Sequence, residues 1–417
     1  MTYRKRLVDR QLTELLKSAG FVVIEGPKAV GKTETAKQQA KSVARLDIDQ
    51  NSRELARLAP ETLLDQDPPL LIDEWQLVPQ IWSNIKVEVD TRSERGQFIL
   101  TGSAVPADDI TRDSAAGRVA RIKMRPMTLF EMDLSDGKAS LIQLFQGNFK
   151  PSKGREISLL EIAEIICMGG WPVNFGLSVE QSRRIVEAYV DELISIDLER
   201  ISGVRFNKNN LRKVMMSLAR NVGTKASDKT IGSDVIGGEA IVDRKTVADY
   251  VESMSRAMVI ENNLPWTPKL RSRDRINGSS TRYFVDPSIA AAALGATPKR
   301  LSSGEIKLLG FLFENLVIRD LKCYMQSNWG KVSQYRDSSG LEVDAILELG
   351  NGDWGAIEVK LGGAQIDDAA ANLHKFKAKV DIAECGAPKF LAVITSSGGS
   401  YLREDGVHVI AIGTLGP

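Results

Sequence analysis

The sequence predicts an α/β protein whose first part is a parallel β-sheet covered by helices. Two observations predict this class. Short β-rich runs alternate with helical segments, and the polar residues that are candidates for a catalytic or binding role fall at the ends of these runs. The runs occupy residues 21–25, 45–48, 70–73, 97–101 and 118–123. Strands that alternate with helices favour a parallel sheet, because each connection crosses the sheet before the next strand begins. Ligands of such sheets bind at the carboxyl ends of the strands, so we expect the functional residues there.

Length and charge set limits on the organisation of the chain. Its 417 residues are too many for one hydrophobic core, so we expect three domains over residues 1–150, 151–300 and 301–417. A stretch rich in glycine, serine and lysine at 133–157 is consistent with the first boundary. The 55 Lys and Arg residues against 54 Asp and Glu residues give a net charge of +1. This balance excludes a basic field over the whole protein, so any contact with nucleic acid depends on a local patch.

The composition also argues against several classes of site. The three cysteines lie far apart without a C-x-x-C pair, and the two histidines have no suitable partners in the sequence. Disulfides, zinc sites and histidine-dependent catalysis are therefore not expected. The start, MTYRKRLVDRQL, lacks the apolar segment of a secretory leader, and no stretch is long and apolar enough to span a bilayer. We expect a cytoplasmic protein without a membrane partner.

The stretch FVVIEGPKAVGKTET joins an apolar strand to a helix through the pattern G-x-x-x-x-G-K-T. Its glycines let backbone N–H groups turn inward around a phosphate, and the following helix N-terminus favours negative charge. The spacing predicts a P-loop, the phosphate-binding loop of nucleotide triphosphatases, with Lys32 at the β- and γ-phosphates and the Thr33 hydroxyl on Mg²⁺. The residues expected to bind nucleotide are Gly26, Pro27, Lys28, Ala29, Val30, Gly31, Lys32, Thr33 and Glu34.

A second apolar run, PLLIDEWQ, ends in two acidic residues. Asp73 is expected to hold the Mg²⁺ shell, and Glu74 is expected to polarise the attacking water. Taken alone, an apolar run before Asp-Glu is more often a strand that ends at a solvated turn. Its position about forty residues after the phosphate loop favours the catalytic interpretation.

Two further candidates follow later strands. In FILTGS, a hydroxyl of Ser103, ahead of Thr101, is a candidate sensor of the γ-phosphate, although small polar residues after a strand are also ordinary turn residues. In DSAAGRVARIKMR, Arg118 is the first candidate for an arginine finger or sensor, acting in cis or in trans. The alternation from Val119 to Met124 indicates that some arginines of this run simply face water.

The motifs GPKAVGKT, LLIDEWQ, FILTGS, AGRVARIKMRPMTLFE and GGWP resemble those of bacterial and archaeal AAA-type ATPases joined to the domain of unknown function 4143. The resemblance covers nearly the whole chain and implies binding of ATP with Mg²⁺ and ATP hydrolysis. Members usually have arginine where this chain has Lys28, and isoleucine or alanine where it has Trp75. The resemblance also implies an acidic position near Asp197, to which the sequence assigns no chemistry.

The middle of the chain predicts a long helix over residues 179–200 and a winged-helix-like segment over residues 211–266. Three short helices and a hairpin fit that arrangement, with Asp243 capping a helix that carries Arg244 and Lys245. These basic side chains would contact DNA phosphates. The alternative is a packing module whose basic residues are only solvated. The family resemblance suggests a winged helix here without implying DNA binding.

The last part of the chain predicts a second α/β domain. An amphipathic helix over residues 308–324 carries Glu314, and strands at 341–347 and 354–359 form a hairpin that carries Asp344 and the pair Glu358 and Lys360. This constellation resembles the restriction-endonuclease-like PD-(D/E)xK fold, which implies that Asp344 and Glu358 hold Mg²⁺ and that Lys360 activates hydroxide. The alternatives are a same-face pair on an exposed strand, or a binding platform without activity.

Together these observations predict an ATP-hydrolysing P-loop ATPase whose nucleotide state repositions a winged-helix module and a nuclease-like module. A slow nucleotide-dependent switch that binds a protein partner is the alternative, and an ATP-gated, metal-dependent DNA nuclease is a third interpretation. The candidate partners are ATP, double-stranded DNA and a protein. An arginine finger acting in trans would require an oligomer.

Overall fold

The structure of the protein is a computed structural model that describes residues 3–102, 115–203, 205–235, 244–269 and 280–417. Contacts divide the chain into two compact units. The N-terminal unit consists of residues 1–125, 196–205 and 252–259, and the C-terminal unit consists of residues 126–195, 206–251 and 260–417. These units differ from the three predicted domains. One reason is that β6 (Ala139–Ser140) pairs with β15 (Leu415–Gly416), which attaches the segment after residue 125 to the end of the chain.

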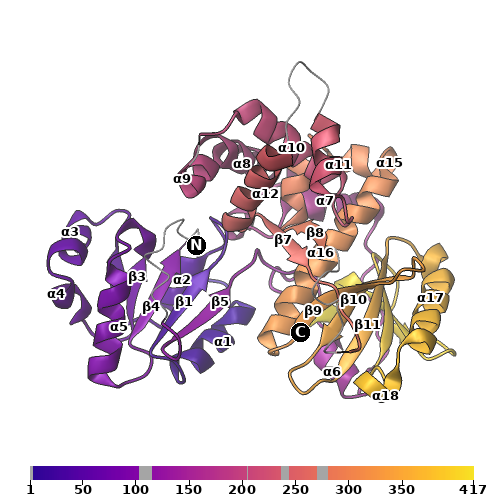
Figure 1. The fold of residues 1–417 in the computed structure, drawn as a ribbon. Helices are drawn as coiled ribbons and strands as arrows, with labels where there is room; N and C mark the ends of the chain where they lie inside the picture. The colour runs from indigo at the N-terminus through magenta and orange to yellow at the C-terminus, as the bar shows by residue number, and fades with distance from the viewer. Residues whose placement is uncertain (1–2, 103–114, 204, 236–243, 270–279) are drawn as a thin grey trace. The chain divides into compact units, whose positions relative to one another are not determined.

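The N-terminal unit alternates strands and helices, as Figure 1 shows in indigo and purple. Its elements are α1 (Leu7–Leu16), β1 (Phe21–Glu25), α2 (Lys32–Lys37), β2 (Ser42–Arg45), α3 (Gln50–Leu58), α4 (Pro60–Leu64), β3 (Leu70–Asp73), η1 (Trp75–Leu77), α5 (Ile81–Arg92), β4 (Phe98–Gly102) and β5 (Val119–Lys123). The strands form one parallel sheet in the order β2-β3-β4-β1-β5. The predicted α/β class and parallel sheet are confirmed.

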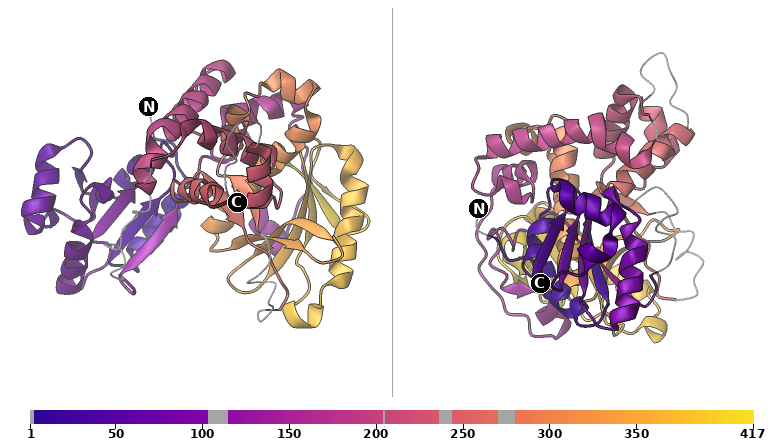
Figure 2. Two further views of the ribbon diagram at one scale, coloured as in Figure 1. Left: turned by 45° about the horizontal axis from the view of Figure 1, so that its top comes forward. Right: turned by 90° about the vertical axis from the view of Figure 1, so that its left-hand side faces the viewer.

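Side chains alternate between the two faces of this sheet, and both faces are buried. Phe21 and Val23 of β1 belong to a core cluster with Trp82 of α5, where the rings of Phe21 and Trp82 meet edge to face at 5.2 Å. The intervening residue Val22 is also fully buried, and α1 packs against β1 and β5. Figure 2 shows these strands flanked by helices. This burial explains why the strands appear in the sequence as short apolar runs.

One predicted strand is displaced along the chain. The run at 45–48 was expected to be a strand, but β2 ends at Arg45. The reason is the following helix: Asp49 caps α3 by accepting a hydrogen bond from the Asn51 N–H at 3.0 Å, so the residues after Arg45 form the turn into that helix. Arg45 therefore ends a strand and lies at the carboxyl edge of the sheet.

The C-terminal unit contains a group of helices and a six-stranded mixed sheet. The elements before this sheet are α6 (Leu141–Phe145), α7 (Leu159–Met168), η3 (Pro172–Asn174), α8 (Val179–Glu192), α10 (Lys208–Arg220), α11 (Asp228–Val235), α12 (Arg244–Arg256), β7 (Ile260–Asn263), β8 (Thr281–Phe284), α14 (Pro287–Ala293), α15 (Pro298–Ser303) and α16 (Ile306–Ser327). The last turn of α12 lies in the N-terminal unit, as do the π-helical stretch η4 (Leu193–Asp197), in part, and α9 (Leu198–Ser202).

The mixed sheet follows α16 and has the order β13-β14-β12-β11-β10-β9. Its elements are β9 (Lys331–Arg336), β10 (Glu342–Glu348), β11 (Trp354–Lys360), η5 (Gly363–Gln365), α17 (Ile366–Lys379), α18 (Ile382–Cys385), β12 (Leu391–Thr395), β13 (Tyr401–Leu402), β14 (Val407–Ala411) and η6 (Ile412–Thr414). The predicted hairpin is present, because β10 and β11 are antiparallel neighbours. Helix α17, yellow in Figure 2, packs along β10, β11 and β12.

Three helices occur in the middle segment as predicted, but the hairpin extends beyond the predicted range of residues 211–266, because its second strand, β8, lies at Thr281–Phe284. Helices α10, α11 and α12 are followed by β7 and β8, which pair antiparallel from Ile260 with Phe284 to Asn263 with Thr281. Between α10 and α11, Thr224 forms an antiparallel bridge with Arg282 of β8. The segment is therefore a helical group with a small sheet beside it.

A buried network of charged side chains gives a structural role to two motifs for which the sequence alone indicates no chemical role. Arg319 of α16 contacts the carboxylates of Asp286 and Asp320, each at 2.7 Å, and all three side chains are almost completely buried. The second oxygen of Asp320 accepts the backbone N–H of Leu129 at 3.0 Å, and Asp286 accepts that of Gly170 at 3.0 Å. The network thus joins the RPMTLFE and GGWP motifs to α16.

The backbone at position 170 leaves room only for glycine. A Cβ atom at this position would lie 2.1 Å from the carbonyl oxygen of Met127, which is far inside van der Waals contact.

Within the described residues, no helix is long and apolar enough to cross a membrane.

Candidate functional site

The loop between β1 and α2 has the backbone that a phosphate-binding loop needs. Gly31 has a left-handed conformation, with φ of 93°, directly before α2 begins at Lys32. A Cβ atom on Gly26 would lie 2.3 Å from the carbonyl oxygen of Met124, so only glycine fits there. Because β1 delivers this loop to the carboxyl edge of the sheet, the loop stands at the start of a helix and beside the ends of the neighbouring strands.

Lys32 lies inside this loop. Its Nζ donates hydrogen bonds to the carbonyl oxygens of Gly26 at 2.9 Å and Pro27 at 2.8 Å. Burial lowers the pKa of Lys32 to about 8, although the nearby carboxylates of Glu74 and Asp73 act in the opposite direction. The ammonium group is therefore held at the centre of the loop and is easily deprotonated for a lysine.

Thr33 and Asp73, both predicted as Mg²⁺ ligands, meet at the edge of the sheet. The Thr33 hydroxyl donates to Asp73 Oδ1 at 2.8 Å, and the hydroxyl of Thr101 donates to the same oxygen. Asp73 is 1% exposed. The parallel register explains the convergence, because Asp73 of β3 lies beside Thr101 of β4, the strand next to β1. A carboxylate and a hydroxyl are ligands that suit Mg²⁺, so these side chains fit the ion.

Glu74 follows Asp73 in a left-handed backbone conformation, with φ of 54° and ψ of 44°. This conformation is uncommon for a residue with a side chain and often marks a functional position. Gln76 Nε2 donates a hydrogen bond to Glu74 Oε2. The predicted site did not include Gln76, although it completes the DEWQ motif. It fixes the carboxylate of Glu74 beside the end of β3.

Arg45 is a second residue that the sequence did not identify. It lies in register with Asp73 at the carboxyl edge, and its Nε is 3.4 Å from Asp73 Oδ2. Its Nη2 donates to Asp47 at 3.1 Å. The prediction missed Arg45 because it placed this residue at the start of a strand rather than at its end. The guanidinium group stands directly beside the predicted Mg²⁺ ligand.

Arg118 does not lie at this edge. It precedes β5, and the register of β5 with β1 starts at Val119 beside Phe21, whereas the phosphate loop follows Glu25 at the other end of β1. Its guanidinium forms a two-pronged contact with Asp90 at 2.5 and 2.9 Å. Arg118 therefore lies at the edge of the sheet opposite the phosphate loop of its own chain, and its role at a γ-phosphate stays a prediction. Ser103 lies outside the described residues.

Lys28 has a partner from a distant part of the sequence. Its Nζ donates to Asp197 Oδ1 at 2.5 Å, and Asp197 belongs to the same compact unit as the phosphate loop. The remaining predicted loop residues Pro27, Ala29, Val30 and Glu34 lie in the loop or in the first turn of α2. Glu34 bonds to Lys37 on the surface of that helix at 2.8 Å and has no contact with the other candidates among the residues described.

The second group of candidates meets in the C-terminal unit. Lys360 Nζ lies 2.6 Å from Glu358 Oε2 and 3.6 Å from Asp344 Oδ2. Asp344 also accepts the Val359 N–H at 2.8 Å, and Glu358 accepts a bond from Asn372 of α17 at 2.8 Å. The register of β10 with β9 shifts between Val343 and Ile346, an irregularity of the kind that redirects side chains near functional sites.

The charges of this group affect one another. Burial, followed by the charge of Asp344, raises the pKa of Glu358 to about 8. The same two causes raise the pKa of Glu314 well above its usual range, while a hydrogen bond from Tyr283 at 2.6 Å acts against them. Burial lowers the pKa of Lys360, but the carboxylates of Asp344 and Glu358 outweigh it and the pKa is raised. The site gathers more acid than one lysine neutralises.

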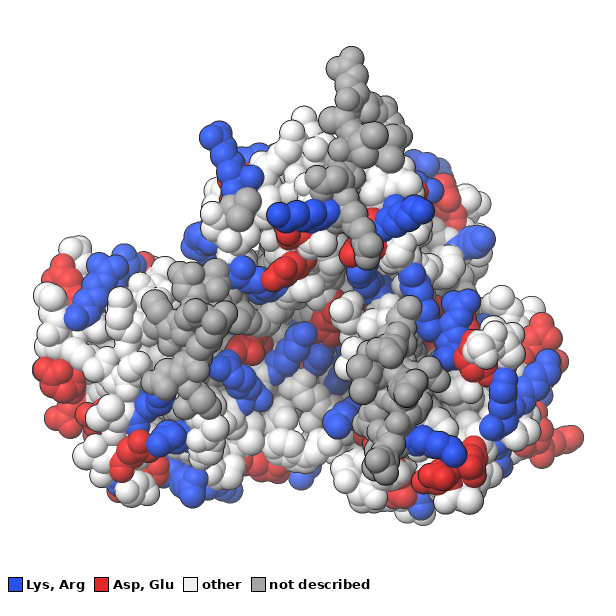
Figure 3. Space-filling view, viewed as in Figure 1, with Lys and Arg blue, Asp and Glu red and all other residues white. Residues whose placement is uncertain are grey.

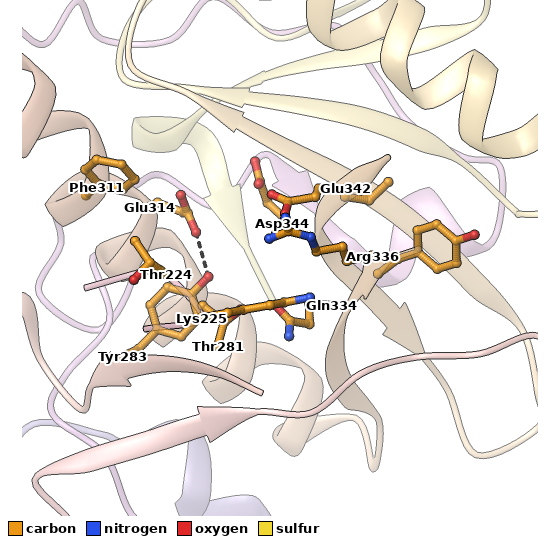
Figure 4. A pocket seen from close by; sticks show the side chains of 13 residues that line it. Thr224, Lys225, Thr281, Tyr283, Phe311, Glu314, Gln334, Arg336, Glu342 and Asp344 are labelled. Carbon is orange, nitrogen blue, oxygen red and sulfur yellow. Dashed lines mark hydrogen bonds and ion pairs between the residues drawn. The ribbon is translucent and has the colours of Figure 1, made fainter. Parts of the chain in front are cut away.

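A cavity of about 220 Å³ opens beside these acids. Figure 4 shows Glu314 and Asp344 on its wall, with a dashed line from Glu314 to Tyr283. Lys225 and Arg336 are the basic residues of the lining. Among the described residues, no three carboxylate, imidazole or thiolate groups are arranged to hold a metal ion, and the Lys360 ammonium lies between the two predicted ligands. Metal binding by Asp344 and Glu358 stays a prediction.

The predicted basic face of α12 is described only in part. Its described exposed charged residues are Lys245, Asp249 and Glu252, so this part of the helix surface carries charges of both signs. Asp243 and the side chain of Arg244 lie outside the described residues. Figure 3 shows basic and acidic side chains interspersed over the face drawn, without one large field of either sign.

A local basic stretch occurs instead along and after α10. Residues 203–227 contain six basic and no acidic residues, in a chain of net charge +1. The basic residues of α10 lie on its exposed face and are Lys208, Arg212, Lys213 and Arg220. Arg212 pairs with Asp191 at 2.7 Å, and both side chains are about half exposed. Such surface pairs are weak and are easily exchanged for other anions.

Comparison with known families places these sites in three matched regions. Residues 18–132 match the family described as an AAA domain. Residues 309–415 match the domain of unknown function DUF4143, and residues 159–300 match the domain of unknown function DUF8612. The nucleotide-site candidates of β1 to β4 lie in the first region, and the acidic cavity residues Glu314 and Asp344 lie in the DUF4143 region.

Two curated relatives and one solved structure are similar to the chain. Uncharacterised proteins of Mycobacterium tuberculosis and Mycobacterium bovis are each 25% identical over 365 residues, which is 86% of this chain and 74% of theirs. A Walker-type ATPase of Pyrococcus abyssi is 12% identical, with a TM-score of 0.42 over 68% of this chain and 94% of that one.

Proposed function

From the premise that this chain joins an AAA-type P-loop ATPase domain to a DUF4143 domain, we propose that it binds ATP with Mg²⁺ and hydrolyses the γ-phosphate. One observation carries the proposal: Thr33 and Asp73, which are forty positions apart, are hydrogen-bonded at 2.8 Å beside Lys32 and Glu74. A loop that does not bind phosphate would not require a helix N-terminus, an ammonium group and two acids at one edge of a sheet.

Each residue of this edge has a role in the proposed reaction. Lys32 turns from the carbonyl oxygens of Gly26 and Pro27 to the β- and γ-phosphate oxygens, while loop N–H groups bind the remaining oxygens. Mg²⁺, held by Thr33 and Asp73, would neutralise charge that develops on the phosphates. Glu74, fixed by Gln76, orients the attacking water and accepts its proton. Arg45, whose guanidinium lies beside Asp73, is an arginine at this edge that could contact the phosphates.

The pKa of Lys32 provides a direct test of ATP binding. In the free protein this pKa is lowered to about 8, so the side chain is largely neutral at pH 9. A bound triphosphate favours the ammonium form, so binding at about pH 9 should take up close to one proton and the affinity should fall as pH rises through 8. Calorimetry in two buffers of different ionisation enthalpy measures this uptake.

The matched variant for this test is Lys32→Met, which retains an unbranched side chain without a proton to gain. Uptake that persists in Lys32→Met would assign the proton to another group. Absence of binding heat from ATP in the folded parent protein would end the proposal.

A second candidate function, metal-dependent cleavage of phosphodiesters, is favoured by the contacts of Lys360 with Glu358 and Asp344 beside a cavity that Asp344 and Glu314 line. Lysine beside paired carboxylates is an arrangement that can hold a metal and activate hydroxide. We expect cleavage of plasmid DNA with Mn²⁺ or Mg²⁺ by the parent protein and none by Asp344→Asn. The control for the gel analysis is Asp353→Asn, whose carboxylate lies 3.2 Å from Lys389 Nζ. Equal cleavage by Asp344→Asn, or none by the parent with or without ATP, rejects this candidate.

We also propose that α10 contacts the phosphate backbone of double-stranded DNA. The finer interpretation of α10 to β8 as a winged helix is supported by their order and by the Thr224 to Arg282 bridge, and the described exposed charges of α12 are of both signs. The exposed Arg212 and Lys213 of α10 are better suited to phosphates.

Reversing both charges, in Arg212→Glu with Lys213→Glu, should weaken binding of double-stranded DNA at least about tenfold and reduce the slope of log affinity against log salt by about two. Fluorescence anisotropy over a NaCl series measures both quantities. The control reverses Lys375 and Lys377 on the exposed side of α17, which changes net charge equally. Equal losses of DNA affinity in the two double variants would show that the affinity depends only on net charge.

A further inference from the structure

Lys28, the third residue of the phosphate loop, is the counter-ion of a buried carboxylate. Its Nζ lies 2.5 Å from Oδ1 of Asp197, which is only 3% exposed. Among the described residues, the other cation near Asp197 is Arg200, whose Nη2 is 3.7 Å away. Because a buried carboxylate is costly unless it is paired and hydrogen-bonded, Asp197 depends on Lys28.

Asp197 reaches this position through an irregularity in a long helix. Helix α8 ends at Glu192, and the π-helical stretch η4, Leu193–Asp197, connects it to α9. A π-helical turn contains an extra residue, and such turns occur frequently at functional sites. Without that residue, every side chain beyond it would rotate by about 100° around the helix axis. The direction of Asp197 is therefore a specific product of this insertion.

The segment that carries Asp197 is also the place where the chain enters the N-terminal unit. Residues 196–205 and 252–259 belong to the compact unit of the phosphate loop, while residues 126–195 and 206–251 belong to the other unit. Within the N-terminal unit, Arg256 Nη2 donates to the carbonyl oxygen of Ile201 at 2.7 Å, which joins the two inserted segments. The Lys28 to Asp197 contact thus attaches the nucleotide loop to these segments.

We infer that Asp197 and the triphosphate compete for the Lys28 ammonium. This inference rests on the proposed ATP binding. A triphosphate carries several negative charges, and lysine is a mobile point charge on a flexible stem, so it can turn from one anion to the other. When Lys28 turns to the phosphates, Asp197 loses its hydrogen-bonded counter-ion and residues 193–205 become less stable.

The competition has a definite sign in binding experiments. Asp197→Asn releases Lys28 and should bind ATP at least about fivefold more tightly than the parent, the lower end of typical coupling between sites. Lys28→Met should bind ATP more weakly than the parent, and the double variant should resemble Lys28→Met because Asp197 acts through Lys28. Calorimetric titration of ATP into the four full-length proteins gives these affinities.

Hydrogen exchange tests the ion pair without nucleotide. Lys28→Met should speed amide exchange across residues 193–205 in the free protein, and ATP should do the same in the parent. Lys37→Met is the matched control, because Lys37 lies on α2 beside the same loop and pairs with Glu34 on the surface at 2.8 Å. It should leave exchange at residues 193–205 unchanged.

Two results would overturn the inference. Equal or weaker ATP binding by Asp197→Asn would mean that Asp197 holds Lys28 toward the phosphates or has no effect on it. Unchanged exchange at residues 193–205 in free Lys28→Met would mean that the segment does not depend on the pair. A parent protein that binds no ATP rejects the proposed function instead, and the exchange comparison still decides the role of the ion pair.

Discussion

Replacing Glu74 with glutamine is expected to lower kcat for ATP hydrolysis by at least about a hundredfold, the usual contribution of a positioned general base. Glutamine keeps the size and the left-handed backbone position of Glu74, with φ of 54°, but cannot accept the proton of the attacking water. The affinity for ATP should change little, because in the proposed mechanism Lys32 and the loop N–H groups, not Glu74, bind the phosphates. Steady-state phosphate release and calorimetric ATP binding measure the two quantities.

Two further variants separate catalysis from structure in this experiment. Gln76→Ala removes the hydrogen bond to the Glu74 carboxylate, so kcat should fall less than in Glu74→Gln while ATP binding persists. Glu54→Gln changes an exposed carboxylate on α3 that bonds to Gln50 at 3.0 Å, and should have no effect. Normal turnover by Glu74→Gln would remove Glu74 from the mechanism and leave the role of general base without a residue.

Replacing Arg319 with methionine is expected to destabilise the C-terminal unit by about 3–5 kcal/mol. The substitution leaves Asp286 and Asp320 fully buried without the guanidinium that both contact at 2.7 Å. Both carboxylates also accept backbone N–H groups of distant segments, so the loss should extend to the GGWP motif through Gly170. Urea unfolding, followed by tryptophan fluorescence and circular dichroism, gives the change in free energy.

The control for Arg319 is Arg300→Met on α15. Arg300 lies 3.6 Å from Glu305 and both side chains are exposed, so this change should cost less than about 1 kcal/mol. Adding Asp286→Asn and Asp320→Asn to Arg319→Met should recover much of the stability, because no buried charge remains unpaired. A loss below 1 kcal/mol in Arg319→Met would show that water or other groups solvate the two acids.

The sequence predicted the nucleotide site because that site depends on local patterns. The spacing from Gly26 to Thr33 gave the loop, and the apolar run before Asp73 gave the second strand. A parallel sheet then brings the two together, so the contact of Thr33 with Asp73 follows from the fold class. Arg45 was missed because the predicted strand began three residues too late, which put Arg45 at the start of the strand instead of its end. Arg118 precedes its strand, so it reaches the edge of the sheet opposite the phosphate loop.

The sequence predicted which residues form the acidic site of the C-terminal unit, but not which residues surround them. The alternation of Glu358 and Lys360 and the hairpin with Asp344 follow from the two-residue period of a strand. The contact of Tyr283 with Glu314 and the cavity lined by Lys225 do not, because they join segments that are 31 and more residues apart. Nothing in the local sequence specifies which distant polar groups satisfy a buried acid.

By itself, the sequence determined the fold class, the phosphate loop and the acids that end β3, since strand period, glycine spacing and strand-to-helix order are local properties of a chain. Only the tertiary structure decided which charges meet: Lys28 with Asp197, Arg45 with Asp73, and Arg319 with two buried acids. The physical reason is that burial makes an unpaired charge costly, so each buried acid must find a cation wherever packing brings one, without regard to distance along the chain.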